Sequence, residues 1–455
     1  MQAGFSKVLI NPRRGLPLAG YFNPRPNIGV RDDLLVRCVL FRKGRSVCGF
    51  ITFDLCMIGA EFVDAVLAQL KKAGFRHGNG LVFSATHTHT APYVVPLFGT
   101  SPDPDYMRNL ADKTVEAVLT AEQNLAPSTL KLGGVKDNPH AFNRRYWMKS
   151  GGVMTNPGVK NPDIVKPEGT VDREIGVLAV EQDGRVVAIL TNIVNHTDTI
   201  GIDQVSADWP GRMERCIQTA LGYDPLVMTL IGCSGNINHL DVASDEHQGY
   251  TYDRAWQIGQ CYAERVLAQL KKLKTLKVGQ ITLVNKKISI PFRTITKEMC
   301  EAALDVLNRV PAQFSDNDLT SEGLATGEGP VARFFAEQTL ACHARCSEKR
   351  RTFRLVTLAF GDCFAVTSLP GEPFTEVGLA IKRNSPFKTT WPVALAMGAC
   401  GYVPLAECFT RGGYETLPVE GGAPREDTAE RLLQTTSENL KQVASQPRSC
   451  AATKQ

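Results

Sequence analysis

Two histidines separated by one residue follow a short apolar run, in the segment Ser84-Ala-Thr-His87-Thr-His89-Thr-Ala-Pro92. In an extended chain, side chains two residues apart point to the same side. Two imidazoles in that arrangement can act as adjacent metal ligands, or as one ligand and one proton carrier. A pair of histidines that caps a strand and bonds to neighbouring loops would show the same spacing. The pair therefore favours metal chemistry and leaves a structural role open.

A third histidine and one carboxylate occupy comparable places. His196 follows a β-type run that ends at Val194, and Glu372 lies in a Pro-Gly-Glu-Pro segment between an expected strand and an expected helix. A lone histidine often has a purely structural role, and a carboxylate before a helix can cap its N-terminus. If both residues meet His87, two neutral imidazoles and one carboxylate form a donor set that zinc accepts, with room for water or substrate. Such a site predicts hydrolysis.

Other chemistries have weaker support. The segment Gly232-Cys-Ser-Gly235 suggests a nucleophile loop, but it does not fit the G-x-S-x-G pattern and has no assignable base. Cys342 and Cys346 lie one helical turn apart without a second pair at zinc-ligand spacing. Glycine-rich phosphate-binding motifs are absent, which argues against nucleotide chemistry.

The elements that must position these residues alternate between strand-length apolar runs and helical periods. This pattern favours an α/β fold of layered mixed sheets flanked by helices. The sequence shows no repeat of fixed period and no dividing linker. Expected strands cover 36–41, 47–55, 81–85, 175–181, 186–194, 226–231, 280–290, 353–360, 363–368 and 389–397; expected helices cover 60–73, 106–123, 208–221, 251–273, 297–309, 331–347 and 427–443. Several strands end just before the polar residues named above, at the end where α/β sheets usually hold ligands.

Two segments have little periodicity and are expected to shape a substrate pocket. Residues 138–172 are rich in Pro, Gly and Asn, and are interpreted as a long functional loop; residues 315–330 form an insertion. Together with the rest of the chain, these segments are expected to form a single catalytic domain over 1–444, followed by a disordered tail over 445–455.

Composition narrows the class of protein. The 455 residues are 43% hydrophobic and 21% charged, which is typical of globular proteins and excludes coiled-coil and disordered classes. The net charge of +5 is spread along the chain without basic runs, so no nucleic acid partner is expected. The chain has no run of 18 consecutive apolar residues, so no membrane insertion is expected. Its N-terminus lacks the pattern of a secretion signal. Thirteen cysteines without framework spacing indicate reduced thiols, so a cytoplasmic location is expected.

Taken in order, the motifs resemble the catalytic domain of the neutral, non-lysosomal ceramidase family over nearly the whole chain. The segment around His87 and His89 is similar to the family's A-T-H-T-H-S-G-P, and Ser206-Ala-Asp-Trp-Pro-Gly211, which follows His196, is similar to its S-x-D-x-x-G. The resemblance implies a zinc-dependent amidohydrolase. In it, His87 and His196 bind zinc, and His89 faces the substrate and moves the proton.

The later motifs extend the resemblance. Pro370-Gly-Glu372-Pro-Phe-Thr375 is similar to the family's G-E-x-T turn, which implies that Glu372 is the zinc carboxylate. Tyr402 matches the family's tyrosine ligand and Tyr414 a second tyrosine. Arg144 matches an arginine near the reacting group. The resemblance therefore implies zinc ligands His87, His196, Glu372 and Tyr402, with His89, Arg144, Asn238 and Tyr414 in catalytic roles.

Two departures bear on the substrate. The family's G-D-V-S-P-N loop appears as Gly235-Asn-Ile-Asn238-His, so Asn238 stands at the position of a serine that contacts the scissile amide. An amide can donate a hydrogen bond to an oxyanion but cannot act as a nucleophile, so metal-activated water would carry the chemistry. The chain also ends near the close of the catalytic domain, so no C-terminal immunoglobulin-like domain is expected.

The sequence thus favours a zinc hydrolase that cleaves the amide bond of a small or medium-sized polar N-acyl substrate. Three alternatives stay open: an esterase, lactonase or glycoside-directed hydrolase on the same scaffold, a non-catalytic metal-binding protein, and a true ceramidase. The sequence does not indicate an oligomeric state.

Overall fold

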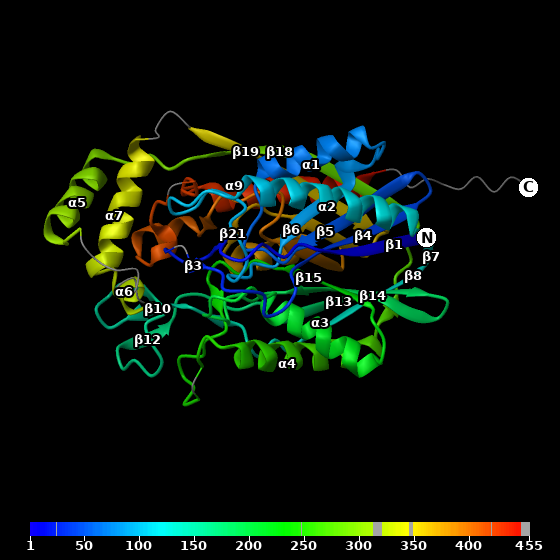
Figure 1. Ribbon diagram of the computed structural model, residues 1–455, viewed down its shortest axis with the longest axis horizontal. Coiled ribbons are helices and arrows are strands. Elements are labelled where there is room, and N and C mark those ends of the chain that lie inside the picture. Colours follow the sequence, from blue (N-terminus) through cyan, green and yellow to red (C-terminus); the bar gives the residue numbers. More distant parts are fainter. Residues whose placement is uncertain (24, 247, 313–320, 345–348, 420, 447–455) are drawn as a thin grey trace, which may run out of the picture.

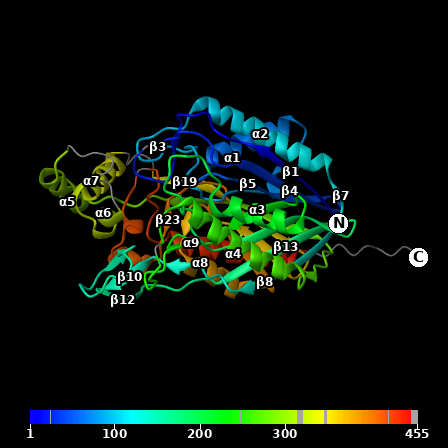
Figure 2. The same ribbon diagram turned by 60° about the horizontal axis from the view of Figure 1, so that its bottom comes forward.

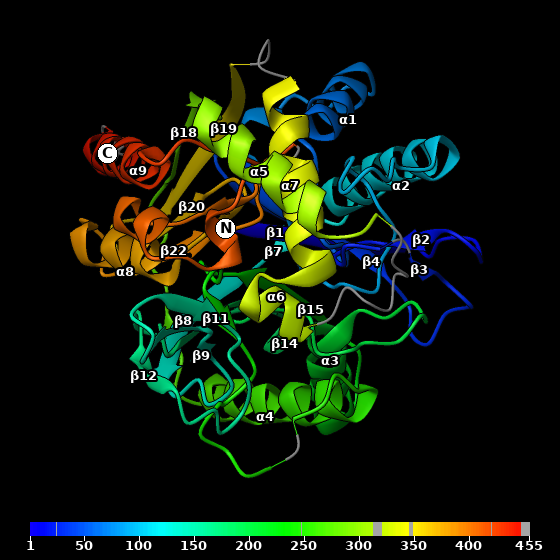
Figure 3. The same ribbon diagram turned by 90° about the vertical axis from the view of Figure 1, so that its left-hand side faces the viewer.

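Three units with the same order of elements make up most of the computed structural model, which describes residues 1–455 except 24, 247, 313–320, 345–348, 420 and 447–455. Each unit has three antiparallel strands, a helix, a fourth strand parallel to the third, and a second helix. The sheet orders are β6-β5-β4-β1, β15-β14-β13-β8 and β22-β20-β19-β18. The helix pairs α1/α2, α3/α4 and α8/α9 surround the centre in Figure 3.

The bounds of the units are as follows. Unit one contains β1 (Gln2–Leu9), β4 (Leu35–Lys43), β5 (Ser46–Phe53), α1 (Ala60–Lys72), β6 (Leu81–Ala85) and α2 (Pro104–Gln123). Unit two contains β8 (Thr129–Lys136), β13 (Glu174–Gln182), β14 (Arg185–Ile193), α3 (Asp208–Leu221), β15 (Leu226–Ile231) and α4 (Tyr252–Leu270). Unit three contains β18 (Ile281–Pro291), β19 (Arg350–Phe360), β20 (Phe364–Ser368), α8 (Thr375–Asn384), β22 (Thr389–Val393) and α9 (Thr428–Ser445).

Each unit carries an insertion at the same place, between its first and second strands. The insertions are residues 10–34, 137–173 and 292–349, and their elements are β2 (Pro17–Leu18) and β3 (Arg25–Pro26); β9 (Phe142–Asn143), β10 (Arg145–Met148), β11 (Val153–Thr155) and β12 (Ile164–Pro167); and α5 (Lys297–Arg309), α6 (Ser321–Thr326) and α7 (Gly329–Ala344). They gather at one end of the molecule, at the left in Figures 1 and 2. Phe22 of the first insertion packs on Phe334 of the third, with ring centroids 4.7 Å apart, and α6 contacts β11.

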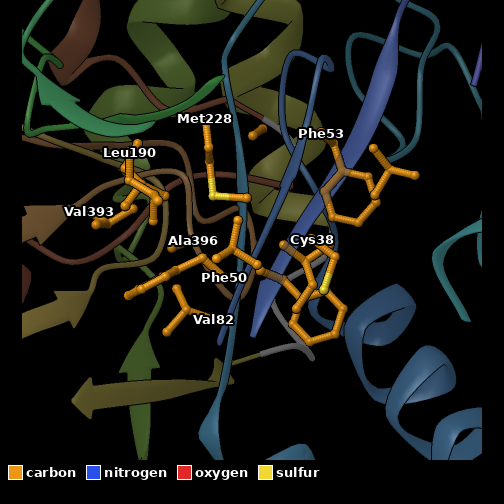
Figure 4. Packing of buried hydrophobic residues seen from close by; sticks show 14 of the residues in the cluster. Cys38, Phe50, Phe53, Val82, Leu190, Met228, Val393 and Ala396 are labelled. Atoms are coloured by element: carbon orange, nitrogen blue, oxygen red, sulfur yellow. The ribbon is translucent and has the colours of Figure 1, made fainter. Parts of the chain in front are cut away.

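Two short strands, β7 (Ala126–Pro127) and β17 (Lys274–Thr275), extend the first and second sheets. Two-stranded sheets are formed by β16 (Ile237–Asn238) with β9 and by β21 (Glu372–Pro373) with β23 (Tyr402–Val403). The main core lies where the three units meet. Strands β6 and β15 are buried at every residue, as expected for parallel strands covered on both faces. Figure 4 shows side chains from all three units in this core, among them Phe50, Met228 and Val393.

The structure confirms the α/β class, but it changes the expectation for one segment. The segment 138–172 is not a structureless loop, because it contains β9 to β12, and β10 to β12 form a small sheet. A search of the sequence for a fixed period does not detect the structural repeat, because the three insertions differ in length. Cys346 and residues 315–320 of the segment 315–330 lie outside the described residues. The structure has no disulfide among its eleven described cysteines. Among the described residues, no helix is long and apolar enough to cross a membrane.

Candidate metal centre

One donor from each of the three units meets at the end of the molecule that carries the insertions. His87 follows β6, His196 follows β14, and Glu372 follows β20. Their ligand atoms lie within 4.8 Å of one another. His87 Nε2 is 3.0 Å from His196 Nε2 and 3.2 Å from Glu372 Oε2. All three side chains are buried, so the sequence-predicted donors converge.

Hydrogen bonds to backbone carbonyls orient both imidazoles. His87 Nδ1 lies 2.7 Å from the carbonyl oxygen of Cys56, and His196 Nδ1 lies 3.4 Å from that of Ser234. A carbonyl only accepts, so each Nδ1 donates and each Nε2 is left for the centre. Metal-binding histidines typically have such outer partners.

The donor set fits a zinc ion. Glu372 Oε2 is buried and has no hydrogen-bond partner, an arrangement that is costly unless a cation lies beside it. Burial tends to lower the pKa of His87, but the charge of Glu372 outweighs it and raises that pKa well above its ordinary value. Burial likewise tends to raise the pKa of Glu372, but His87 lowers it. The three donors therefore favour one positive charge between them, and two nitrogens with one carboxylate oxygen are ligands that zinc prefers.

The backbone at His87 differs from the extended chain that the sequence suggested. Strand β6 ends at Ala85, and His87 has a φ of 71°, a left-handed conformation that is costly for a non-glycine residue. The two rings still approach, because His89 Nε2 lies 3.3 Å from His87 Nε2. Strain of this kind is typical of functional sites.

The first insertion packs on the far side of His89. Asp198 Oδ1 lies 3.5 Å from His89 Nδ1 and accepts a hydrogen bond of 2.6 Å from the hydroxyl of Tyr21. Tyr21 also contacts the His89 ring edge-on, and Arg25 donates to the His89 carbonyl at 2.7 Å. Burial and the neighbouring His87 lower the pKa of His89 well below its ordinary value. His89 is thus a neutral imidazole with its Nε2 beside the donor cluster.

Gly20 packs directly against this ring. A Cβ atom at Gly20 would lie 2.5 Å from His89 Cγ and Nδ1, and its φ is +101°. We expect Gly20→Ala to displace His89 and lower kcat about tenfold. Gly15→Ala is the matched control, since Gly15 has a φ of +88° and open space around it. An alanine in the left-handed conformation lowers the free energy of unfolding of both variants by about 1–2 kcal/mol. Equal kcat values in the two variants would contradict the prediction.

Arg144 lies beside both predicted tyrosines. Its guanidinium carbon is 5.2 Å from the ring centroid of Tyr402 and 5.2 Å from that of Tyr414. Tyr402 pairs with Glu372 in the parallel β21–β23 ladder, which places it next to the donor cluster. Burial and the charge of Glu372 raise the pKa of Tyr402 well above its ordinary value, so its hydroxyl is protonated in the absence of a metal.

Glu415 is a residue of this site that the sequence reasoning missed. Its buried carboxylate accepts hydrogen bonds from Arg144 Nε at 2.9 Å, from Arg145 Nη1 at 2.7 Å and from Thr155 Oγ1 at 2.7 Å. Burial tends to raise the pKa of Glu415, but Arg145 and Arg144 lower it. The sequence signal was available, because Glu415 directly follows the tyrosine of the Gly413-Tyr-Glu415 motif.

Asn238 has partners of its own. Its Nδ2 donates to Asn156 Oδ1 at 2.6 Å, and its Oδ1 accepts from the backbone N–H of Leu240 at 3.0 Å. One Nδ2 hydrogen is left for any oxyanion role. The neighbouring Cys233 is buried among apolar side chains, and burial raises its pKa, which disfavours it as a nucleophile.

A cavity of about 830 Å³ opens onto the donor cluster. His87, His89, Glu372 and Tyr402 line one part of it. Its apolar walls come mainly from α1, α2, residues 94–98, residues 417–419 and residues 421–424. Among the described lining residues, none belongs to 138–172 or to 321–330, so these parts of the two segments do not line the cavity, and residues 315–320 lie outside the described part of the chain. The segment 138–172 instead contributes Arg144, whose guanidinium lies over the ring of Tyr402.

His239, next to Asn238, predicts acid sensitivity. It is buried, neither ring nitrogen has a hydrogen-bond partner, and burial lowers its pKa to about 4. The unfolded chain takes up this proton near pH 6.5 and the folded chain does not, so stability falls as the pH drops from 6.5 towards 4. This group contributes a loss of about 3 kcal/mol over that range. We expect His239→Phe to flatten the decrease, measured by urea unfolding at several pH values; an unchanged decrease would contradict it.

Comparison with known proteins places the fold. The neutral ceramidase from Pseudomonas aeruginosa matches with a TM-score of 0.72 and 16% identity, over 96% of this chain and 74% of that one. A ceramidase complexed with C2 matches with a TM-score of 0.70 and the same identity and coverage. No family model matches the sequence, and no curated protein matches it. The chain thus has the neutral ceramidase fold, as the motif resemblance implied, and at this identity the likeness concerns the fold alone.

Proposed function

We propose that the protein is a zinc-dependent hydrolase that cleaves the amide bond of an N-acyl substrate. The observation that carries the proposal is the convergence of His87, His196 and Glu372, one from each unit, with donor atoms within 4.8 Å. Because three units contribute to one site, the proposal includes a single catalytic domain over residues 1–444. Tyr402, beside Glu372, is the proposed fourth ligand. The cytoplasmic location expected from the sequence stays a prediction.

When bound, zinc supplies a Lewis acid that polarises a carbonyl and makes water a nucleophile at neutral pH. His89 has its Nε2 at the cluster, 3.3 Å from His87 Nε2, and is neutral at pH 7, so it can accept a proton there and return it to the leaving amine. Arg144, whose guanidinium carbon lies 5.2 Å from the ring centroid of Tyr414, and Tyr414 itself are the proposed hydrogen-bond donors for the oxyanion of an acyl-transfer reaction. Asn238 keeps one amide hydrogen for the same purpose.

The cavity supports a substrate with an apolar acyl group. Met57, Phe62, Leu97 and Phe353 are among its lining residues, and the cavity reaches the donor cluster directly. A site that holds an acyl chain beside the donors suits an N-acyl compound. The same walls favour the second candidate, a true ceramidase, because ceramide also carries an acyl chain.

The test is turnover by zinc-loaded protein of N-acyl amides with 2 to 16 acyl carbons, beside esters of the same acyl groups. We expect the amides to be cleaved, with kcat/KM rising with chain length, and chelation of the metal to abolish cleavage. Cleavage of the esters alone would favour the esterase alternative. Zinc binding without turnover of either class would favour a non-catalytic metal protein.

A further inference from the structure

Two helices that lie side by side, α1 and α2, form one wall of the cavity at the donor cluster (Figures 1 and 3). Phe62, Ala65 and Gln69 of α1 line the cavity, and Met107 and Ala111 of α2 line it as well. Residues three or four positions apart are neighbours on the surface of a helix, so each set forms a continuous strip. We call the part of the cavity between these five residues the α1–α2 groove.

The strips are not the faces with which the two helices form the core. Those faces consist of buried residues, which are Val63, Val66 and Leu70 of α1 and Tyr106, Leu110 and Ala117 of α2. The groove residues lie one position before this set on α1 and one position after it on α2, which is about 100° around the helix. The groove therefore lies between the flanks of the two helices.

Two alanines give the groove its room. Ala111 is 6% exposed and forms the floor, whereas Ala65 is exposed and lies at the rim. A methyl side chain leaves space that a leucine would fill. Glu61 and Arg108, the charged lining residues of these helices, are both exposed, so their charges lie at the surface. Apart from Gln69, the interior is apolar and suits a hydrocarbon chain.

The groove continues to the donor cluster along residues that line the same cavity. Cys56, before α1, is one of them, and its carbonyl accepts the 2.7 Å hydrogen bond from His87 Nδ1. Gly59 is the N-cap of α1, and a Cβ atom there would lie 3.1 Å from Val95 Cγ1. The start of α1 thus packs closely on the 94–98 segment, which is another apolar wall. A chain attached to a carbonyl at the donors can pass along this segment into the groove.

We propose that the acyl chain of the substrate lies in the α1–α2 groove and that Ala65 and Ala111 set its preferred length. This inference rests on the proposed function, which supplies the acyl group. It goes beyond that function because it assigns the residues that select long chains over short ones. Burial of one more methylene improves binding by up to about fourfold, so a groove of this kind gives a graded preference for length.

The experiment measures kcat/KM of the zinc-loaded protein for N-acylethanolamines with 4, 8 and 12 acyl carbons. In the wild type we expect the 12-carbon amide to exceed the 4-carbon amide by about 100-fold or more. Ala65→Leu and Ala111→Leu should each reduce this ratio to about tenfold or less, because the added side chain occupies the groove. General damage to the enzyme lowers all three rates alike and leaves the ratio unchanged. A wild-type ratio near one, or a ratio that survives in both variants, would overturn the proposal.

The matched control is Ala68→Leu. Ala68 lies on the same helix as Ala65 and is exposed like it, but it does not line the cavity. We expect this control to keep the wild-type ratio. Because Ala65 is exposed, its leucine variant adds no atoms to the core, so the test does not depend on whether Ala111→Leu folds. If Ala65→Leu and Ala68→Leu gave the same ratio, Ala65 would not be part of the chain site.

A pair of isomers decides which side of the amide bond carries the chain into the groove. N-butyldodecanamide has its long chain on the acyl side, and N-dodecylbutanamide has it on the amine side, with the same atoms in both. We expect the first isomer to be cleaved at least about tenfold faster, and only its cleavage to fall in Ala65→Leu. Faster cleavage of the second isomer, or a loss confined to it, would overturn the assignment to the acyl chain.

Binding keeps this result separate from the proposed function. If no amide is cleaved, the proposed function fails, and calorimetric titration of the same N-acylethanolamines decides the inference by itself. At least about tenfold tighter binding of the 12-carbon than of the 4-carbon amide, lost in Ala65→Leu and kept in Ala68→Leu, would support the groove. Equal affinity for the two amides would reject it.

Discussion

Replacing His87, His196 or Glu372 by alanine is expected to remove zinc from the protein and abolish hydrolysis. The three donor atoms lie within 4.8 Å of one another, so each replacement deletes one of the proposed ligands. A catalytic zinc site usually has three protein ligands, and the loss of one opens the site to water and weakens binding strongly. The measurement is metal content by inductively coupled plasma mass spectrometry after gel filtration. We expect about one zinc per wild-type chain and less than about a tenth of that in each variant.

Two controls separate the metal site from general damage. His77→Ala removes a histidine of the segment before β6, away from the cluster, and should keep its zinc. Unfolding curves with and without added zinc should differ for the wild type and coincide for the three variants, since a ligand that binds only the folded state stabilises it. Zinc that is retained in the Glu372 variant would exclude this carboxylate as a ligand and with it the proposed site.

The strands and helices of this fold could be predicted because their signals are local. The apolar runs at β6 and β15 are buried at every residue, and such runs differ plainly from the polar segments that follow them. The threefold arrangement could not be predicted, because it is a relation between units. Insertions of different length separate corresponding strands, so the repeat has no constant period in the sequence.

The convergence of His87, His196 and Glu372 could be predicted because each comes shortly after a strand, and the order of their motifs resembles that of a known family. The residues and backbone conformation that support these donors could not be predicted. Glu415 is close to Arg144 only after the chain has folded, since 271 residues separate them in the sequence. The left-handed φ of His87 is another example, because the hydrogen bond from its N–H to the Leu55 carbonyl, between segments that follow β6 and β5, holds it in place.

Glu415→Gln should lower both stability and catalysis. Glutamine keeps the shape of the side chain but removes the negative charge that faces two buried arginines. Breaking a buried ion pair by neutralising one partner typically costs about 3–5 kcal/mol, because the other charge is left buried and unpaired. Glutamine keeps only one of the two oxygens, so an NH2 group then faces either Arg144 Nε or Arg145 Nη1, and the negative charge that holds Arg144 beside Tyr402 and Tyr414 is lost. We expect kcat to fall about 100-fold in the folded fraction, the usual effect of losing an oxyanion donor.

The control for this variant is a substitution at Glu168, which pairs with the same Arg145. The side chain of Glu168 is buried and pairs with Arg145, as Glu415 does, but its other ion-pair partner among the described residues is Arg411 and not Arg144. Glu168→Gln should therefore lower the midpoint of urea unfolding and leave kcat within about threefold, whereas Glu415→Gln should lower both. If both variants lost the same amount of activity, the loss would follow from the common damage at Arg145, and Glu415 would have no separate role in positioning Arg144. Zinc content should be unchanged in both variants, because neither carboxylate contributes a donor atom to the cluster.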